Sequence, residues 1–304
     1  MFSTKDLNSN NIKSEKLRAK TILSGYAKVG CDAINVGNYE LLAGLNFLKS
    51  IKAEYSSPFI SANIRDSKSN QLVFKPYTIL ERDDLKIGII GLNNSYPDTI
   101  KSVVVDDYIS SGNNIISKIS KEVNIIVLLI NSGRSTYESL PELFPKADFI
   151  FVSGSTMRTN SNTPQRKNGP FVYSPGKQGK YLTVADVSIK ENGKKLFDIS
   201  SVNKKIKSIN KRFSRLQKKD PNRTLDEIYK DQNNILKLIA QYRSDLDIAE
   251  EDLSNAINTF TYNMVSLNKK IKDDPDMKVF VENAVKQCDL LNTNKIKKPK
   301  HNHK

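Results

Sequence analysis

The chain has 304 residues, 38% hydrophobic and 27% charged, with a formal net charge of +15. Its length allows one large domain or two ordinary ones, and no run of about 18 apolar residues predicts a membrane-spanning helix. We interpret the charge as a solvated basic surface, not a nucleic-acid interface, because lysines dominate without an arginine–aromatic pattern. Cys31 and Cys288 predict no disulfide framework, and the first ten residues do not have the pattern of a signal peptide.

Residues 1–200 alternate between helical and strand patterns. Helices are expected at 14–30, 38–54, 108–120 and 136–143. Strands are expected at 32–37, 58–64, 72–82, 85–92, 123–130, 147–154, 169–175 and 181–189, the last turning at 191–193 into 194–200. Continuous apolar strands between helices predict an α/β fold whose sheet is covered on both faces, with antiparallel strands added late.

The pattern changes near residue 200. Apolar residues then recur at alternating spacings of four and three, which predicts a coiled-coil hairpin with a short arm at 202–219 and a long helix at 225–272. Asn263 falls at an apolar seam position of that long helix. Another helix is expected at 273–291, followed by a disordered basic tail. The predicted domains are therefore 1–200, 201–290 and the tail 291–304, and residues 202–271 could bind a protein partner or a second copy.

Several segments, in order over residues 20–190, resemble one known family. They are GYAKVGCDAINVGNYEL, PFISANIRD, FKPYTILERDDLKIGIIGL, VNIIVLLINSGRS, ADFIFVSGST and GPFVYSPGKQGKYLTVADVSI. Together they resemble the N-terminal domain of the 5′-nucleotidase and UDP-sugar hydrolase family, which are calcineurin-like metallophosphoesterases. The resemblance implies a layered α/β sandwich, phosphoester hydrolysis by two divalent ions such as Zn, Mn or Mg, and export to the periplasm.

Few of the metal ligands that the resemblance implies are present. Asn38 and Glu40 match the family's Gly-Asn-His-Glu motif, but Tyr39 stands at its histidine. Asn131 stands at the next ligand histidine. The last motif offers Gly154 and Thr156 or, in a shifted register, Ser155 and Met157. The family's earliest motifs would lie at or before Met1, so we expect the domain to be incomplete at its N-terminus.

Amide and hydroxyl oxygens bind Zn and related ions weakly, whereas imidazole binds them strongly. The only histidines are His301 and His303, in a lysine-rich tail. The sequence therefore predicts a degenerate homologue with no cofactor, vestigial metal positions at Asn38, Asn131 and Thr156, and a binding or interaction role. One alternative is an active nucleotide or UDP-sugar phosphohydrolase with an atypical site completed by residues upstream of Met1.

A further alternative is a module that binds a nucleotide or phosphate without turnover. The residues that could contact such an anion are Ser153, Ser155 and Lys180. They lie in SGST, which offers hydroxyls and backbone N–H groups, and in SPGKQGKY, which is glycine-rich and basic but lacks the spacing of a phosphate-binding P-loop. An ordinary loop and a hairpin turn are the simpler interpretations of these two segments.

Overall fold

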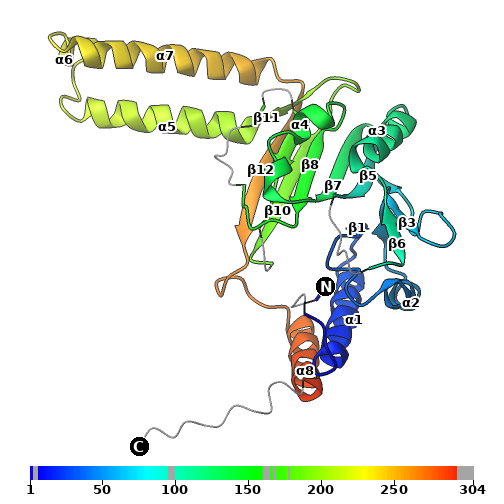
Figure 1. Cartoon of the computed structure of the whole chain (residues 1–304). Helices are drawn as coiled ribbons and strands as arrows, with labels where there is room; N and C mark the ends of the chain where they lie inside the picture. Colours follow the sequence, from blue (N-terminus) through cyan, green and yellow to red (C-terminus); the bar gives the residue numbers. More distant parts are fainter. Residues whose placement is uncertain (3–5, 95–99, 160–164, 167–168, 177–178, 293–304) are drawn as a thin grey trace, which may run out of the picture. The chain divides into compact units, whose positions relative to one another are not determined.

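The computed structural model describes residues 1–2, 6–94, 100–159, 165–166, 169–176 and 179–292 (Figure 1). The chain divides into two compact units. Unit 1 comprises 1–157, 170–180 and 267–304, and unit 2 comprises 158–169 and 181–266. Across the described residues, no helix is both long and apolar enough to pass through a membrane.

Unit 1 is built around a five-stranded sheet with the order β4-β5-β7-β8-β9. Its strands are β4 (Tyr77–Arg82), β5 (Leu85–Asn93), β7 (Ile125–Asn131), β8 (Phe149–Ser153) and β9 (Phe171–Tyr173). The last four are parallel, and β4 joins β5 as an antiparallel edge. The predicted hairpin is confirmed, although its first strand begins at Tyr77 and not at residue 72. Its turn places Asp83 at φ 49°, in the left-handed region that Asp tolerates better than most residues.

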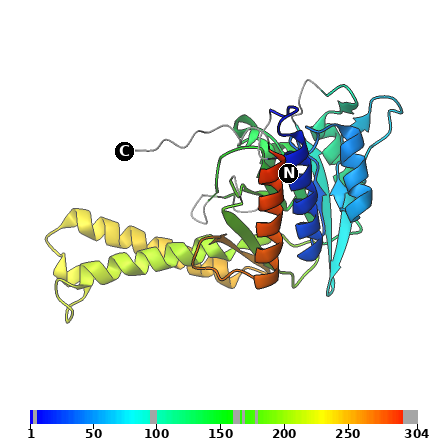
Figure 2. The ribbon, with the colours of Figure 1, turned by 90° about the horizontal axis from the view of Figure 1, so that it is seen from below.

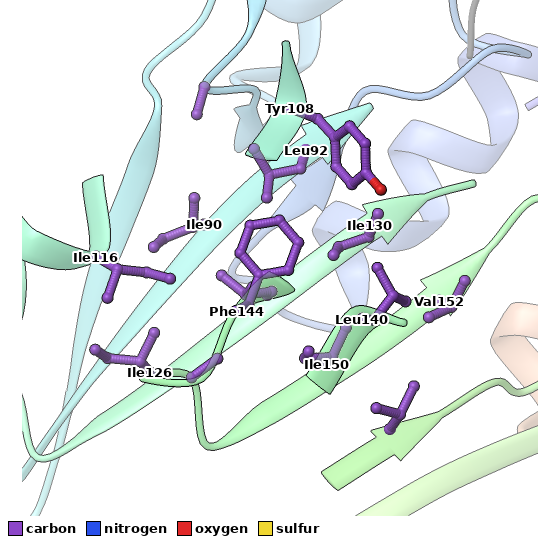
Figure 3. Packing of buried hydrophobic residues seen from close by; sticks show 14 of the residues in the cluster. Ile90, Leu92, Tyr108, Ile116, Ile126, Ile130, Leu140, Phe144, Ile150 and Val152 are labelled. Atoms are coloured by element: carbon purple, nitrogen blue, oxygen red, sulfur yellow. The ribbon is translucent and has the colours of Figure 1, made fainter. Parts of the chain in front are cut away.

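One face of this sheet carries the larger apolar core. It is covered by α3 (Tyr108–Ile119) and the short α4 (Leu140–Leu143), which follows the 3₁₀ turn η1 (Arg134–Thr136). Figure 3 shows the ring of Phe144 lying over the strands among Ile90, Leu92 and Ile130. The alternation of apolar strands and helices in the sequence therefore correctly predicted a helical layer over this sheet. The single helix predicted at 136–143 is replaced by the 3₁₀ turn η1 and the short helix α4.

A second apolar cluster involves α1 (Ile12–Lys28), α2 (Leu45–Tyr55) and two strand pairs. The pairs are β1 (Ile34–Asn35) with β2 (Phe59–Ile60), and β3 (Ile64–Asp66) with β6 (Val103–Val105). Two predictions need correction. Residues 38–43 form turns, so the second helix begins only at Leu45, and the strand expected at 58–64 is divided between β2 and β3.

Helix α8 (Pro275–Leu291) packs along α1, as both ribbon views show (Figures 1 and 2). The Ser14 hydroxyl donates to the Cys288 carbonyl at 2.7 Å, and the Cys288 thiol donates back to the Ser14 carbonyl at 3.5 Å. This reciprocal pair is buried and joins residues near opposite ends of the chain. The helix predicted at 273–291 is confirmed, and residues 293–304 of the predicted tail lie outside the described residues.

Unit 2 contains a three-stranded sheet and two long helices. The sheet has the order β10-β12-β11, formed by β10 (Tyr181–Ser188), β12 (Asn258–Ser266) and β11 (Leu196–Asp198). Strand β12 is antiparallel to β10 and parallel to β11. The prediction of one long helix over 225–272 is therefore wrong. The helix is interrupted after α6 (Leu225–Ile228), and the last third of the range contains strand β12, in which Asn263 pairs with Val184.

The two long helices, α5 (Ile199–Gln217) and α7 (Asn233–Ser254), pack against one another. The ring of Phe213 meets that of Tyr242 edge-on at 6.0 Å, and Lys205 pairs with Asp245 at 2.9 Å. A helical hairpin is thus present, while heptad packing stays a prediction. The predicted domain limits at 200 and 290 also stay predictions, because compactness does not establish which segments fold by themselves.

Candidate functional site

The carboxyl ends of three parallel strands present polar side chains at one edge of the unit 1 sheet. Asn93 ends β5, Asn131 ends β7 and Ser153 ends β8. They are in register, since Asn93 faces Asn131 and Asn131 faces Ser153 across the ladder. In open α/β sheets, ligands bind outside the carboxyl ends of parallel strands. We call this set of strand ends, with the turn 37–40, the strand-end site.

Asn131 lies at the centre of the strand-end site. Its Oδ1 accepts the Asn38 backbone N–H at 3.3 Å, and its Nδ2 donates to the Ser153 hydroxyl at 3.1 Å. The side chain is closely surrounded: a Cβ added at Gly37 would lie 2.7 Å from Asn131 Cγ, and one at Gly154 would lie 3.1 Å from Nδ2. Asn38 and Asn131, which the sequence placed at ligand positions, are therefore neighbours, and both flanking glycines are needed for their approach.

Glu40 is engaged within the same turn. Its Oε2 accepts the Gly37 N–H at 3.0 Å, and its Oε1 lies 3.1 Å from the Met1 ammonium. The carboxylate is largely buried, with its side chain 16% exposed. Glu40 therefore stabilises the backbone of the Gly37–Asn38 turn. Tyr39, the residue before Glu40, is partly buried.

Several further polar residues at this edge were missed by sequence reasoning. The Asn94 amide donates to the Ser132 hydroxyl at 2.9 Å, and Ser132 also lies 2.7 Å from the Thr136 hydroxyl. Beneath them, Asn63 is fully buried and exchanges hydrogen bonds with the Asn93 backbone. An asparagine directly after an apolar run, as in the Asn93-Asn94 pair, is the signal that could have found them.

The loop after β8 holds the remaining predicted residues. Ser155 is 8% exposed, and its hydroxyl accepts the Met157 N–H at 3.1 Å, whereas Thr156 is exposed. Lys180 is also exposed, and its backbone carbonyl accepts the Leu267 N–H. Among the described residues no hydrogen bond joins Lys180 to Ser153 or Ser155, and the anion site suggested for these three residues stays a prediction. His301 and His303 lie outside the described residues.

No family model matches the chain, but individual relatives do. A 2′,3′-cyclic-nucleotide 2′-phosphodiesterase/3′-nucleotidase of Yersinia enterocolitica is 24% identical over 290 residues, covering 82% of this chain and 41% of the relative. A 5′-nucleotidase of Vibrio parahaemolyticus is 24% identical over 244 residues, covering 68% and 44%. Protein UshA of Escherichia coli is 34% identical over 101 residues, which are 33% of this chain and 18% of that protein.

The homologues of this chain are 5′-nucleotidase and UshA-type enzymes of the calcineurin-like metallophosphoesterase superfamily. The chain spans less than half the length of these relatives. The fold agrees: a 5′-nucleotidase precursor of Thermus thermophilus superimposes with a TM-score of 0.51 at 19% identity, over 61% of this chain and 41% of that one. The sulfate thiohydrolase SoxB of the same organism gives 0.50 at 20% identity, over 56% and 32%.

The described side chains at the strand-end site do not fit two divalent ions. Such ions need several carboxylate or imidazole ligands converging on one point. Among the residues that the structure describes, no three His, Cys, Asp or Glu side chains gather in that way. The oxygen of Asn131 is already bonded to Asn38, and both oxygens of Glu40 are engaged. What the edge offers is amides and hydroxyls that bond mainly to one another.

Proposed function

We propose that this chain is a 5′-nucleotidase-like domain that does not hydrolyse phosphoesters by the two-metal mechanism and acts as a binding or interaction module. The single observation that carries this proposal is the donor set of the strand-end site. A two-metal hydrolase uses its ions to polarise the phosphoryl group and to generate hydroxide at neutral pH. Neutral amides and hydroxyls at the same strand ends supply neither function.

The hydrogen bonds of Asn131 support the proposal beyond residue type. A metal ion at this position would have to compete with the Asn38 N–H for Oδ1 and would meet the donor Nδ2 on the other side. Glu40, the one carboxylate of the turn, stabilises the backbone and offsets the Met1 charge. Recruiting it as a ligand would leave a backbone N–H and an ammonium without their acceptor, which costs about 1–3 kcal/mol per group.

The interaction role is proposed for the α5–α7 hairpin of unit 2. Residues 199–219 hold eight Lys or Arg side chains and no Asp or Glu, so this arm presents a basic surface. We propose that the helical part of residues 202–271, from α5 to α7, binds an acidic protein partner or a second copy, with heptad packing along the α5–α7 seam. Sedimentation velocity of the full chain, with and without Lys211→Glu and Arg215→Glu, tests self-association. If the chain is monomeric at all concentrations, self-association is contradicted and binding of a partner protein stays as the proposal.

The decisive test of the first proposal is metal content measured together with hydrolysis. The purified chain is dialysed against Mn or Zn, its metal is quantified by mass spectrometry, and turnover is assayed on nucleotides and UDP-sugars. We expect far less than one ion per chain and no activity above that of a matched Asn131→Ala variant. That variant identifies contaminating phosphatase, because such activity does not depend on Asn131.

Stoichiometric metal with turnover that Asn131→Ala abolishes would overturn the proposal and establish the alternative, an active hydrolase with an atypical site. Metal with no turnover would instead indicate a binding site for ions alone. From the family resemblance we also propose that the protein is exported to the periplasm, which fractionation of the source cells would test.

A further inference from the structure

A cavity in unit 1 has a different character from the strand-end site and shares none of its residues. It has a volume of about 600 Å³ and lies where α2 ends and β2 begins, opposite the segment that precedes β4. Three lysines line it: Lys49, Lys52 and Lys75. Cavities of about 300–1,000 Å³ are typical of small-molecule sites.

The positive charge in this cavity exceeds the negative charge that faces it. Lys49 pairs with Asp66 at 2.8 Å, and its hydrogen bond, together with those from the backbone N–H groups of Lys68 and Ser69, lowers the pKa of Asp66 to about 2. Lys52 lies in the last turn of α2, where a cation complements the partial negative charge of the helix end, of about half a unit. Lys75 is exposed and has no ion pair with a described residue, so at least one full positive charge is left uncompensated.

A buried hydroxyl in the cavity wall supplies a second, independent observation. Ser57 is only 6% exposed, and its Oγ has no hydrogen-bond partner among the described residues. Leaving a buried polar group unpaired costs about 1–3 kcal/mol. A ligand atom that accepts from this hydroxyl would remove that cost.

Most of the remaining wall is apolar. Phe59 and Val73 line the same cavity, and the Phe59 ring packs against Phe74 at 5.9 Å. The Lys52 ammonium lies 5.5 Å from the centre of the Phe74 ring, which is a cation–π contact. The backbone of Lys75 is held in place by a hydrogen bond, because its carbonyl accepts the Ser61 N–H at 2.9 Å.

We propose that this cavity binds the phosphate group of a small phosphomonoester with an apolar body, using Lys52, Lys75 and the Ser57 hydroxyl. A phosphate dianion accepts several charge-assisted hydrogen bonds at once, which matches two ammonium groups and a hydroxyl better than a monoanion does. The apolar body of the ligand lies against Val73 and Phe59. This site is independent of the strand-end site and of any turnover there.

Calorimetric titration of the full chain with phenyl phosphate tests the proposal, with phenol and inorganic phosphate as comparisons. We expect saturable binding of one phenyl phosphate per chain, weaker binding of inorganic phosphate, and none of phenol. Lys75→Gln and Lys52→Gln each weaken binding about tenfold, the loss of one charge-assisted hydrogen bond, and Ser57→Ala weakens it by about fivefold. Circular dichroism verifies that each variant is folded.

Two variants control for general attraction and for location. Lys146→Gln removes an exposed lysine of unit 1 outside the cavity, and it leaves the affinity unchanged. Asn131→Ala alters the strand-end site and also leaves the affinity unchanged. The proposal is overturned if no saturable binding occurs, if Lys146→Gln weakens binding as much as Lys75→Gln, or if Asn131→Ala abolishes binding that Lys75→Gln retains.

Discussion

Asp148 provides a sharp test of the electrostatics of the unit 1 sheet. It precedes β8, and its Oδ2 accepts the Ile126 N–H at 2.8 Å. Its own N–H donates to the Ile126 carbonyl, and its carbonyl accepts from Phe171, so its backbone joins β7 and β9 through the start of β8. Burial raises the pKa of Asp148 from 3.8 to about 6, and the bond from Ile126 only partly opposes this rise.

The sign of the effect follows from proton linkage. Between about pH 4 and pH 6 the folded protein holds a proton on Asp148 that the unfolded chain has lost, so the free energy of unfolding falls as the pH rises. A pKa difference of about two units corresponds to about 3 kcal/mol, reached above pH 6. Asp148→Asn keeps the acceptor for Ile126 without the charge. We therefore expect this variant to be about 1–3 kcal/mol more stable at pH 7 and similar to the wild type below pH 4.

Urea denaturation of both proteins across this pH range measures the difference. Asp148→Ala serves as the control: it removes the charge but leaves the Ile126 N–H unpartnered, so its gain at pH 7 is smaller by about 1–2 kcal/mol. The argument is refuted if Asp148→Asn shows the same pH dependence as the wild type, or if NMR titration gives Asp148 an ordinary pKa.

Three further substitutions test packing and hydrogen bonding by urea denaturation. Gly37→Ala places a Cβ 2.7 Å from Asn131 Cγ and should cost about 1–3 kcal/mol, and less in an Asn131→Ala background; equal costs in both backgrounds would exclude this clash. Asn258→Ala removes four hydrogen bonds to the backbone of residues 190–194 from a side chain 1% exposed, which should destabilise unit 2 by about 2–4 kcal/mol; a loss below about 0.5 kcal/mol would contradict this. Ser14→Ala removes the 2.7 Å bond to Cys288 and should cost about 1 kcal/mol, with faster hydrogen exchange in α8; unchanged exchange would show that the bond does not hold this helix.

The sequence predicted the parallel core of unit 1 because its strands are long apolar runs, such as 125–130, which have one interpretation in an α/β chain. It failed at β12 for an identifiable reason. Phe260 continued the four-and-three spacing of α7, but Phe260 and Tyr262 are both buried in a strand and alternate with exposed or half-exposed residues. Over nine residues, apolar periods of two and of 3.5 residues share several positions. The helical pattern of the preceding segment therefore favoured the prediction of a helix here. The threonines at 259 and 261 favoured the strand.

At the strand-end site, the family resemblance placed Asn38 and Asn131 at matching ligand positions, and the structure puts them in contact. What no sequence pattern could predict is the partner of each polar atom. The bond from Asn131 to Ser153 depends on the register of two strands, and the contact of Glu40 with Met1 depends on where the first residues lie. Such partners are properties of tertiary packing, which a single sequence does not encode in any short pattern.

The missing ligands and the hydrogen bonds of the strand-end site have one physical explanation. Carboxylates gathered at strand ends repel one another unless a cation lies between them, so a two-metal site depends on its ions for stability. Asn131 carries both an acceptor and donors, and it satisfies Asn38 and Ser153 without any ion. An edge built in this way gains nothing in stability from a metal, and a metal would first have to break these bonds. Under the proposed function, these side chains therefore keep the geometry of the strand ends without depending on an ion.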